Sequence, residues 1–505
     1  MTSNMFAAIR HRLRDFQKPF LETLEGRKIT YGEVVSESAK FAHALKALGV
    51  KPGDRVTVQL DKSPEAIFLY LACLRAGAIF VPLNTAYTSR ELDYFIGDSD
   101  PALVVCRAQS AEVVKQLCKD LKVNACEILD EKLAGSLLEI AALQEPVFSD
   151  VERDADDLAA ILYTSGTTGR SKGAMLTHGN LASNALTLVN AWHFKKDDVL
   201  LHALPIFHTH GLFVATNVTL FAGATMLFLP KFDPELVLRA MPRATVMMGV
   251  PTFYVRLLQD PRLNKDVSSH IRLFISGSAP LQEETHRVWK LRTGHSILER
   301  YGMTETNMNT SNPYVGERIP GTVGFPLPGV EVRITNPQTG QSCATDEIGM
   351  IEVKGPNVFK GYWRNPEKTL SEFRDDGYFI TGDLGKIDKR GYVLIVGRDK
   401  DLIITGGYNV YPKEIELEID AIPGIVESAV IGLPHPDFGE AVTAILVLDE
   451  VHSLTEADVL AALENQVAGF KRPKRVLFAR DLPRNSMGKI EKNVLRQKYS
   501  DLYHI

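Results

Sequence analysis

The sequence predicts an α/β protein: a large N-terminal domain with layered α/β subdomains and a small β-rich subdomain, then a small α+β C-terminal domain. Strand-like and helical segments alternate through the first half, which is typical of layered, largely parallel sheets. After about residue 320, short strands separated by Gly, Pro and Asp dominate up to Val396. From Arg398 onward the pattern returns to strand, helix and strand.

The first half gives the clearest alternation. Apolar residues at helical spacing predict a helix over residues 36–48, which Gly49 can end. The segments that follow predict, in order, a strand over 55–60, a helix over 65–77 and a strand over 79–83. A second cycle begins with an apolar strand over 158–163 and continues through a Gly/Ser/Thr loop to a helix near 181–192.

The C-terminal part predicts a helix over 412–419, strands over 426–432 and 443–448, and a helix over 456–466. Charged residues at 398–401 interrupt two apolar runs. We place a domain boundary there, which gives domains of residues 1–398 and 399–505.

Composition excludes several classes of protein. The chain has 505 residues, 45% apolar and 24% charged, as in globular proteins. A net charge of -5 gives no reason to expect nucleic acid as a partner. No signal peptide is expected, and no apolar run is long enough for a membrane span. Five scattered cysteines without a C-x-x-C pair argue against disulfides or zinc and indicate a reducing, cytoplasmic setting.

A Gly/Ser/Thr loop over residues 164–173 follows a buried strand and predicts a phosphate-binding site. Glycines allow close backbone approach, hydroxyls and N–H groups can wrap phosphate oxygens, and a lysine can neutralise their charge. The register of a Walker loop is absent, and the alternative is a flexible polar turn. The candidate residues are Thr164, Ser165, Gly166, Thr167, Thr168, Gly169 and Lys172.

Five ordered motifs carry a resemblance to a known superfamily. They are the loop at 164–173, Y-G-M-T-E at 301–305, T-G-D at 381–383, the segment 397–409 and P-R-N-S-M-G-K at 483–489. Together they resemble acyl- and aryl-CoA synthetases, peptide-synthetase adenylation domains and luciferases over nearly the whole chain. The resemblance implies an AMP-forming acid–thiol ligase that uses ATP, Mg²⁺ and coenzyme A.

The resemblance assigns nucleotide contacts that also make physical sense. Glu305 offers a hard oxygen ligand for Mg²⁺, Thr304 a donor to the α-phosphate, and Tyr301 a face for adenine. Asp383 can accept both ribose hydroxyls, and Arg398 would complete the ribose and phosphate contacts. The alternatives are a solvated carboxylate for Glu305 and a turn aspartate for Asp383.

Lys489 resembles the lysine that reaches the acyl carboxylate and the phosphate during adenylation. A fixed cation there offsets the charge that develops in the transition state. An exposed surface lysine is the alternative. Acetylation would remove the charge, so a lysine acetyltransferase and deacetylase are possible partners acting on Lys489.

The resemblance also implies a mobile C-terminal domain that serves the second half-reaction. Lys400 would be the hinge, and Gly406 and Gly407 would face the pantetheine arm of coenzyme A. Lys471 and Arg472 are candidates for its phosphates, although a solvated basic pair is an equal alternative.

Two arginines set the expected acyl pocket apart from that of many relatives. Arg300 precedes the Y-G-M-T-E motif, where many relatives are neutral, and Arg256 lies in a segment that often faces the acyl chain. Cations in an apolar pocket are costly unless an anion pairs with them, which a second substrate carboxylate would supply. The alternatives are an ion pair of Arg300 with Glu299 or Glu317, and a surface position for Arg256.

His208, by resemblance, occupies the gating aromatic position of the acyl pocket and is a candidate catalytic residue. Thr209, Ser278 and Met308 are candidates to shape the space around the acid. His210 completes an H-x-H pair, but no third ligand is nearby, so a metal is not expected there. The pattern R-Y-G-M-T-E-T-N-M most resembles malonyl-CoA synthetases, which implies malonate, possibly methylmalonate, as substrate.

Other classes of protein stay open at this point. The chain could ligate another short-chain acid or use a different acceptor. A peptide-synthetase module is possible in chemistry, although no carrier domain follows Lys489. A luciferase-like oxygenase would share the adenylate, and a nucleotide-binding scaffold would be expected to lose Lys489 or Glu305, which are both present.

Overall fold

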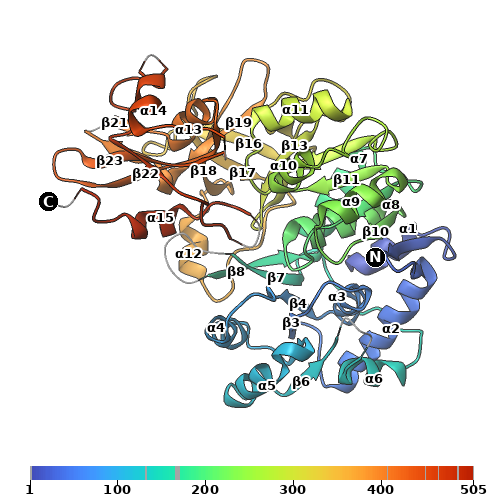
Figure 1. The fold of residues 1–505 in the computed structure, drawn as a ribbon. Helices are drawn as coiled ribbons and strands as arrows, with labels where there is room; N and C mark the ends of the chain where they lie inside the picture. Colours follow the sequence, from blue (N-terminus) through green and yellow to red (C-terminus); the bar gives the residue numbers. More distant parts are fainter. Residues whose placement is uncertain are drawn as a thin grey trace. The chain divides into compact units, whose positions relative to one another are not determined.

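A computed structural model describes residues 3–130, 134–164, 171–406, 408–449, 451–464, 466–485 and 488–503. The chain forms two compact units (Figure 1). The first contains Met1–Pro320, Gly324–Glu331 and Val353–Phe379. The second contains Gly321–Val323, Val332–Glu352 and Ile380–Ile505. The short strands after residue 320 are therefore shared between the units, and the boundary at 398–401 stays a prediction.

The first unit holds a six-stranded sheet among its described residues, with parallel pairing except between the last two strands. In sheet order the strands are β6 (Ala125–Ile128), β5 (Leu103–Cys106), β3 (Arg55–Gln59), β4 (Ile79–Pro82), β7 (Leu158–Thr164) and β8 (Lys172–Thr177). The Gly/Ser/Thr segment predicted to bind phosphate lies between β7 and β8 in the sequence, and β8 pairs back on β7. The sequence pattern led from this loop directly to a helix and missed β8.

Helices cover both faces of this sheet, with α4 and α5 on one side and α2, α3 and α6 on the other (Figure 1). Their bounds are α2 (Tyr31–Ala47), α3 (Pro64–Ala76), α4 (Ser89–Ser99), α5 (Ala111–Asp120) and α6 (Ser136–Ala142). Helix α2 begins five residues before the predicted start, because Thr30 and Glu33 form a capping box. Ser63 caps α3, and Gly77 ends it in the left-handed conformation.

A nine-stranded sheet, counted over the described part of the chain, forms the rest of the first unit. Its inner strands pair in parallel, and its edges are antiparallel. The order is β15 (Phe325–Pro326), β14 (Asn307–Ser311), β13 (Leu298–Met303), β12 (Leu273–Ser276), β11 (Val246–Gly249), β9 (Val199–His202), β10 (Thr225–Phe228), β1 (Pro19–Thr23) and β2 (Lys28–Thr30). The carboxyl ends of the inner strands therefore meet at one edge, where side chains of β9, β12 and β13 can converge.

Helices packed around this sheet bury a core that includes Tyr254, Phe274 and Trp289. Further helices of the first unit are α1 (Met5–Arg12), α7 (His178–Ala191), α8 (Asn217–Ala222), α9 (Pro234–Ala240), α10 (Pro251–Gln259), α11 (Glu283–Thr293), α12 (Pro366–Ser371) and the π-helical segment η2 (His210–Thr216). A π-helix is rare and often marks a functional site.

The second unit contains two smaller sheets among its described residues. The four-stranded sheet, whose first three strands straddle the division between units, is β16 (Glu331–Thr335), β17 (Gly349–Lys354), β18 (Phe379–Ile387) and β19 (Val393–Arg398). The other sheet is β21 (Tyr408–Val410), β20 (Ile403–Thr405), β23 (Gly439–Leu448) and β22 (Ile425–His435), with β24 (Arg475–Phe478) beside β23. The helices are α13 (Pro412–Asp420), α14 (Glu456–Ala462), α15 (Lys492–Lys498) and the 3-10 turn η4 (Asp399–Asp401). The layered α/β architecture with a small α+β part agrees with the fold class that the sequence predicts.

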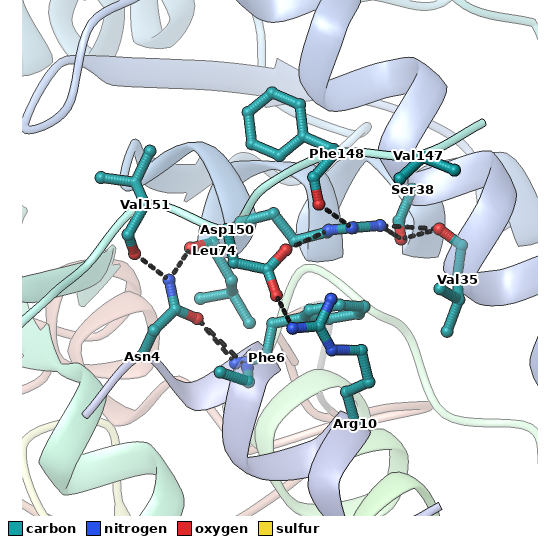
Figure 2. Close-up of polar contacts among 12 residues, drawn as sticks. Asn4, Phe6, Arg10, Val35, Ser38, Leu74, Val147, Phe148, Asp150 and Val151 are labelled. Atoms are coloured by element: carbon teal, nitrogen blue, oxygen red, sulfur yellow. Dashed lines mark hydrogen bonds and ion pairs between the residues drawn. The ribbon is translucent and has the colours of Figure 1, made fainter. Parts of the chain in front are cut away.

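A buried ion pair fastens the N-terminal part of the first unit (Figure 2). Arg75, 1% exposed, lies 2.6 Å from a carboxylate oxygen of Asp150. Its other nitrogens donate to the carbonyl oxygens of Val35 and Phe148, and Arg10 adds a second cation at 3.1 Å from Asp150. These contacts join α1, α2, α3 and the segment before β7. Within the described residues, no helix combines the length and the apolar character that crossing a membrane requires.

Candidate active site

Arg300 is a buried cation at the carboxyl end of the nine-stranded sheet. It lies in β13, its residue is 3% exposed, and its buried Nε and Nη2 atoms have no hydrogen-bond partner among the described residues. Its guanidinium packs on Gly277, where an added Cβ would lie 2.4 Å from Cζ. Burial lowers the pKa of Arg300 to about 9, so it remains charged at neutral pH.

The ion pairs that the sequence offered as alternatives for Arg300 do not form: across the described ranges, neither Glu299 nor Glu317 pairs with it. Glu299 instead lies 3.6 Å from the Nδ1 atom of His286. A buried guanidinium with two unpaired nitrogens is costly, so this position favours an anionic ligand.

His208, Thr209 and His210 lie close to Arg300, as the resemblance implies for an acyl pocket. Burial and then the charge of Arg300 lower the pKa of His208 to about 4 and hold that of His210 well below its usual value. Both imidazoles are therefore neutral near pH 7. Ser278 Oγ lies 3.3 Å from His210 Nδ1, and the buried Oγ1 of Thr209 has no described partner.

Met308 is a rigidly held part of the neighbouring strand. It is 2% exposed in β14 and lies opposite Gly302 of β13. The side-chain amide of Asn184 donates to the Met308 carbonyl at 2.9 Å and accepts from its N–H at 3.3 Å. A Cβ at Gly302 would lie 1.9 Å from the Asn307 carbonyl oxygen, so only glycine fits there. Contact between Met308 and the acid stays a prediction.

Arg256 is not a second buried cation, and that expectation is wrong. Its side chain is exposed near the end of α10, because the buried positions of that helix are Pro251, Tyr254 and Leu257. Helical spacing places residue 256 on the opposite face from these three. The surface alternative describes its position, and binding of an acid by Arg256 stays a prediction.

In the first unit, the residues expected to bind the nucleotide include Glu305, which is 6% exposed. The hydroxyl of Tyr362 lies 3.1 Å from Glu305 Oε1 and 2.6 Å from Glu372 Oε2. Lys172 Nζ lies 3.8 Å from Glu372 Oε1 and 4.9 Å from the Tyr362 ring centre. Burial and these two carboxylates raise the pKa of Tyr362, so its hydroxyl stays protonated. Tyr362 and Glu372 were not expected, because nothing local in the sequence links them to Lys172 or Glu305.

A cavity of about 420 Å³ adjoins Lys172 and is predominantly basic. Arg364 and Lys368 line it with Lys172, and Asp98 is its acidic member. Thr164 is the last residue of β7, and its hydroxyl donates a hydrogen bond to the Lys172 carbonyl oxygen at 3.4 Å. The remaining phosphate-loop candidates, Ser165, Gly166, Thr167, Thr168 and Gly169, lie outside the described residues.

Tyr301 and Thr304 come shortly before Glu305 in the sequence. Tyr301 is buried in β13 beside Arg300, and Thr304 is half-buried just after the strand. Adenine stacking by Tyr301 and α-phosphate donation by Thr304 stay predictions.

The second unit contains both the T-G-D motif, which is expected to bind ribose, and the C-terminal lysine. Asp383 of β18 pairs in register with Arg398 of β19, and their side chains form an ion pair at 2.7 Å. Arg398 also donates to the Thr381 carbonyl at 3.3 Å. Lys489 keeps much of its own surface exposed, yet desolvation of its ammonium and then the charge of Arg398 lower the pKa of Lys489 to about 8.

Lys400, the expected hinge, lies in the 3-10 turn η4 and is exposed. Desolvation lowers the pKa of Lys400, while the charge of Asp401 raises it. Asp401 is itself fixed by Arg496 at 2.7 Å. The geometry provides a short turn between two strands, and the hinge role stays a prediction.

The residues expected to bind coenzyme A all belong to the second unit. Gly406 adopts a φ of +57° and donates to the Phe438 carbonyl at 2.8 Å, and Gly407 lies outside the described residues. Lys471 pairs with Glu414 at 2.6 Å, and Arg472 lies 4.0 Å from Glu464. Both cations thus have carboxylate neighbours, and their binding of phosphates stays a prediction.

Comparison with known proteins gives matches over most of the chain. Mitochondrial malonate–CoA ligase of Mus musculus is 37% identical over 93% of this chain and 87% of its own. Feruloyl-CoA synthase of an Amycolatopsis species is also 37% identical, over 94% of each chain. The crystal structure of ATP-bound MatB from Rhodopseudomonas palustris is similar with a TM-score of 0.98 and 62% identity over 100% of both chains.

Two family models match the chain, one over its N-terminal part and one over its C-terminal part. The model described as AMP-binding enzyme matches residues 11–363, which include the phosphate loop, Arg300 and Glu305. The model described as AMP-binding enzyme C-terminal domain matches residues 414–489, which end at the lysine. The chain belongs to the AMP-binding enzyme family.

Proposed function

We propose that the protein is an ATP-dependent malonate–CoA ligase. In the first half-reaction, a carboxylate oxygen of malonate attacks the α-phosphorus of ATP, which forms malonyl-adenylate and releases pyrophosphate. In the second, the sulfur of coenzyme A attacks the acyl carbon, the thiol proton is lost, and AMP leaves. Malonyl-CoA, AMP and pyrophosphate are the products.

The buried guanidinium of Arg300 carries the choice of acid. Malonate has one carboxylate to activate and a second carboxylate two bonds away through a single methylene. An arginine fork binds a carboxylate through two charge-assisted hydrogen bonds, and the buried Nε and Nη2 atoms of Arg300 have no partner among the described residues. Neutral His208 and His210 add no competing charge beside it.

Sequence identity does not separate the malonate and feruloyl enzymes, because both are 37% identical to this chain. Ferulate has a neutral aromatic end and would leave Arg300 without an anion. Leaving a buried charge unpaired costs about 3–5 kcal/mol. This term favours the dicarboxylate over the aromatic acid. Methylmalonate would need room for one more methyl group near Met308 and Thr209.

The residues of the nucleotide side fit a magnesium-bound polyphosphate. Glu305 is the carboxylate that would hold Mg²⁺, and phosphate oxygens would complete its shell, because the described residues contain no cluster of three potential ligands. Bound there, the ion would offset phosphate charge. Lys172 neutralises phosphate oxygens beside the basic cavity, and Lys489 contributes a cation toward the reacting carboxylate and α-phosphate.

The cysteines and Lys489 bear on the compartment and on the regulation of the enzyme. A reducing compartment such as the cytoplasm is supported by five free cysteines, three of them buried. Acetylation of Lys489 would remove the charge that the mechanism requires.

Substitution of Arg300 tests the proposed substrate. Arg300→Met removes the guanidinium but keeps an apolar side chain, so kcat/KM for malonate should fall at least about 100-fold if about 3 kcal/mol of transition-state binding is lost. Propionate should be a poor substrate of the wild-type enzyme and lose far less in the variant. The measurement is AMP formation with each acid in the presence of coenzyme A.

Arg287→Met is the matched control, because Arg287 is exposed and pairs only locally with Glu284. It should leave both acids unaffected. A wild-type preference for propionate or ferulate, or an equal loss of both acids in Arg300→Met, would contradict malonate as the substrate.

A further inference from the structure

A lysine and a histidine outside the proposed chemistry form a buried link behind the acyl pocket. Lys62 lies between β3 and α3, and His202 is the last residue of β9 and fully buried. Lys62 Nζ lies 2.8 Å from His202 Nδ1 and donates to the His202 carbonyl at 2.8 Å. Its ammonium also lies 4.4 Å from the ring centre of Phe228. The pair thus joins the two sheets of the first unit.

The other nitrogen of His202 contacts the backbone that carries the pocket. Nε2 lies 2.9 Å from the Gly211 carbonyl oxygen, which also accepts the Thr216 hydroxyl at 2.9 Å. Gly211 follows His210 directly and belongs to η2. A Cβ on Gly211 would lie 1.9 Å from the Pro205 carbonyl oxygen, so this backbone is confined on one side by Pro205 and held on another by His202.

These contacts fix the protonation state of His202. A carbonyl oxygen only accepts, so Nε2 must carry the proton that faces Gly211. Burial and then the charge of Lys62 hold the pKa of His202 well below its usual value, which leaves one proton on the ring. Nδ1 is therefore an acceptor, and an N–H group of the Lys62 side chain is its donor. Without that donor, the proton could move to Nδ1, and the bond to Gly211 would be lost.

We propose that Lys62 and His202 are positioning residues for acid recognition: Lys62 selects the Nε2–H tautomer of His202, and His202 fixes the Gly211 carbonyl and with it His208, Thr209 and His210 beside Arg300. This inference rests on the proposed function and adds two specificity residues to it. A displacement of about 1 Å in such a site can cost about 100-fold in rate. The effect should fall on the acid, because no described contact of either residue involves Lys172, Glu305 or Tyr362.

The test compares two substitutions that differ only in keeping the donor. His202→Gln places an amide N–H in reach of the Gly211 carbonyl, whereas His202→Leu removes it. In pyrophosphate exchange, His202→Leu should raise KM for malonate at least about 10-fold and leave KM for ATP within about 3-fold. His202→Gln should recover most of the loss. Equal changes for malonate and ATP, or a glutamine variant as impaired as leucine, would reduce the pair to scaffold support and overturn the proposal.

Lys62 supplies an independent arm if His202→Leu does not fold. Lys62→Met alone should raise KM for malonate. The double variant Lys62→Met/His202→Gln should have nearly the KM of His202→Gln, because glutamine has no tautomer for Lys62 to select. Additive losses would contradict the tautomer argument. Lys40→Met is the control, since Lys40 pairs only with Glu37 on its own helix. If the wild-type enzyme activates another acid, the proposed substrate fails, and the same ratios measured with that acid still decide the role of Lys62 and His202.

Discussion

Arg300 and Lys489 show how desolvation gives two cations different uses. The pKa of Arg300 is lowered to about 9, which leaves a permanent positive charge at neutral pH. The pKa of Lys489 is lowered to about 8, close to the pH at which the enzyme would work. Arg300 can therefore bind an anion at any physiological pH, whereas the charge of Lys489 depends on pH.

The pH profile of adenylation should report this difference. The charged form of Lys489 exists below its pKa, so kcat/KM for malonate in pyrophosphate exchange should decline as pH rises through about 8. Lys489→Arg keeps its charge throughout this range, so the decline near pH 8 should disappear or move to higher pH. The assay contains no coenzyme A, so thiol ionisation does not contribute. An unchanged midpoint in Lys489→Arg would remove the lysine from the first half-reaction.

The sequence was sufficient for residues inside motifs and insufficient for links between distant segments. Arg300 could be predicted because it adjoins Y-G-M-T-E, and its burial agrees with the prediction. Tyr362 lies 57 positions from Glu305, and Lys62 lies 140 positions from His202, so no local pattern joins either pair. The prediction of a buried Arg256 is wrong because the sequence does not show which face of α10 lines the pocket, and the helix turns this side chain to solvent.

At the scale of elements, apolar periodicity located helices and strands, and tertiary contacts decided their ends. The strands over 55–60 and 79–83 and the helix over 65–77 were predicted within one residue at each end. The start of α2 was missed although the Thr30 and Glu33 signal was present. The sequence pattern did not predict the π-helical segment η2, in which Gly211 closely approaches the Pro205 carbonyl oxygen.

The β13–β14 hairpin should be sensitive to one added methyl group. Gly302→Ala would place Cβ 1.9 Å from the Asn307 carbonyl oxygen, and a backbone oxygen cannot move without opening the pairing. Because this hairpin carries Arg300 and Met308, kcat/KM for malonate should fall at least about 100-fold. Gly97→Ala in α4 is the control, since its Cβ would meet only Leu121 at 3.6 Å. A Gly302→Ala enzyme with wild-type kinetics would exclude a rigid hairpin.

At the scale of the molecule, stability and chemistry depend on different parts of the chain. The Arg75 ion pair joins segments far apart in the sequence within the first unit and touches no proposed substrate group. Arg300, Glu305 and Lys172 belong to the first unit, and Asp383, Arg398 and Lys489 belong to the second. Substitutions should therefore separate a loss of folding from a loss of one half-reaction.

Arg75→Met should lower stability and spare the chemistry of folded enzyme. It leaves Asp150, whose side chain is 5% exposed, with Arg10 as its one ion-pair partner among the described residues, so a cost of about 3 kcal/mol or more is expected. The melting temperature should fall by several degrees, while kcat at low temperature stays near the wild-type value. Arg287→Met, at an exposed pair, should change the melting temperature far less. A wild-type melting temperature for Arg75→Met would show that the pair stabilises nothing.

Lys489 should serve one half-reaction of the two. Its ammonium offsets charge while the carboxylate attacks the α-phosphorus, and no such charge develops on phosphorus during thioester formation. Lys489→Ala should therefore abolish pyrophosphate exchange with malonate and largely retain transfer from supplied malonyl-adenylate to coenzyme A. Lys498→Ala, exposed on α15 beside Tyr499, is the control and should keep both rates. Parallel loss of both half-reactions in Lys489→Ala would mean that the lysine supports the folding of the second unit as a whole. The assignment of Lys489 to the adenylation step alone would then be wrong.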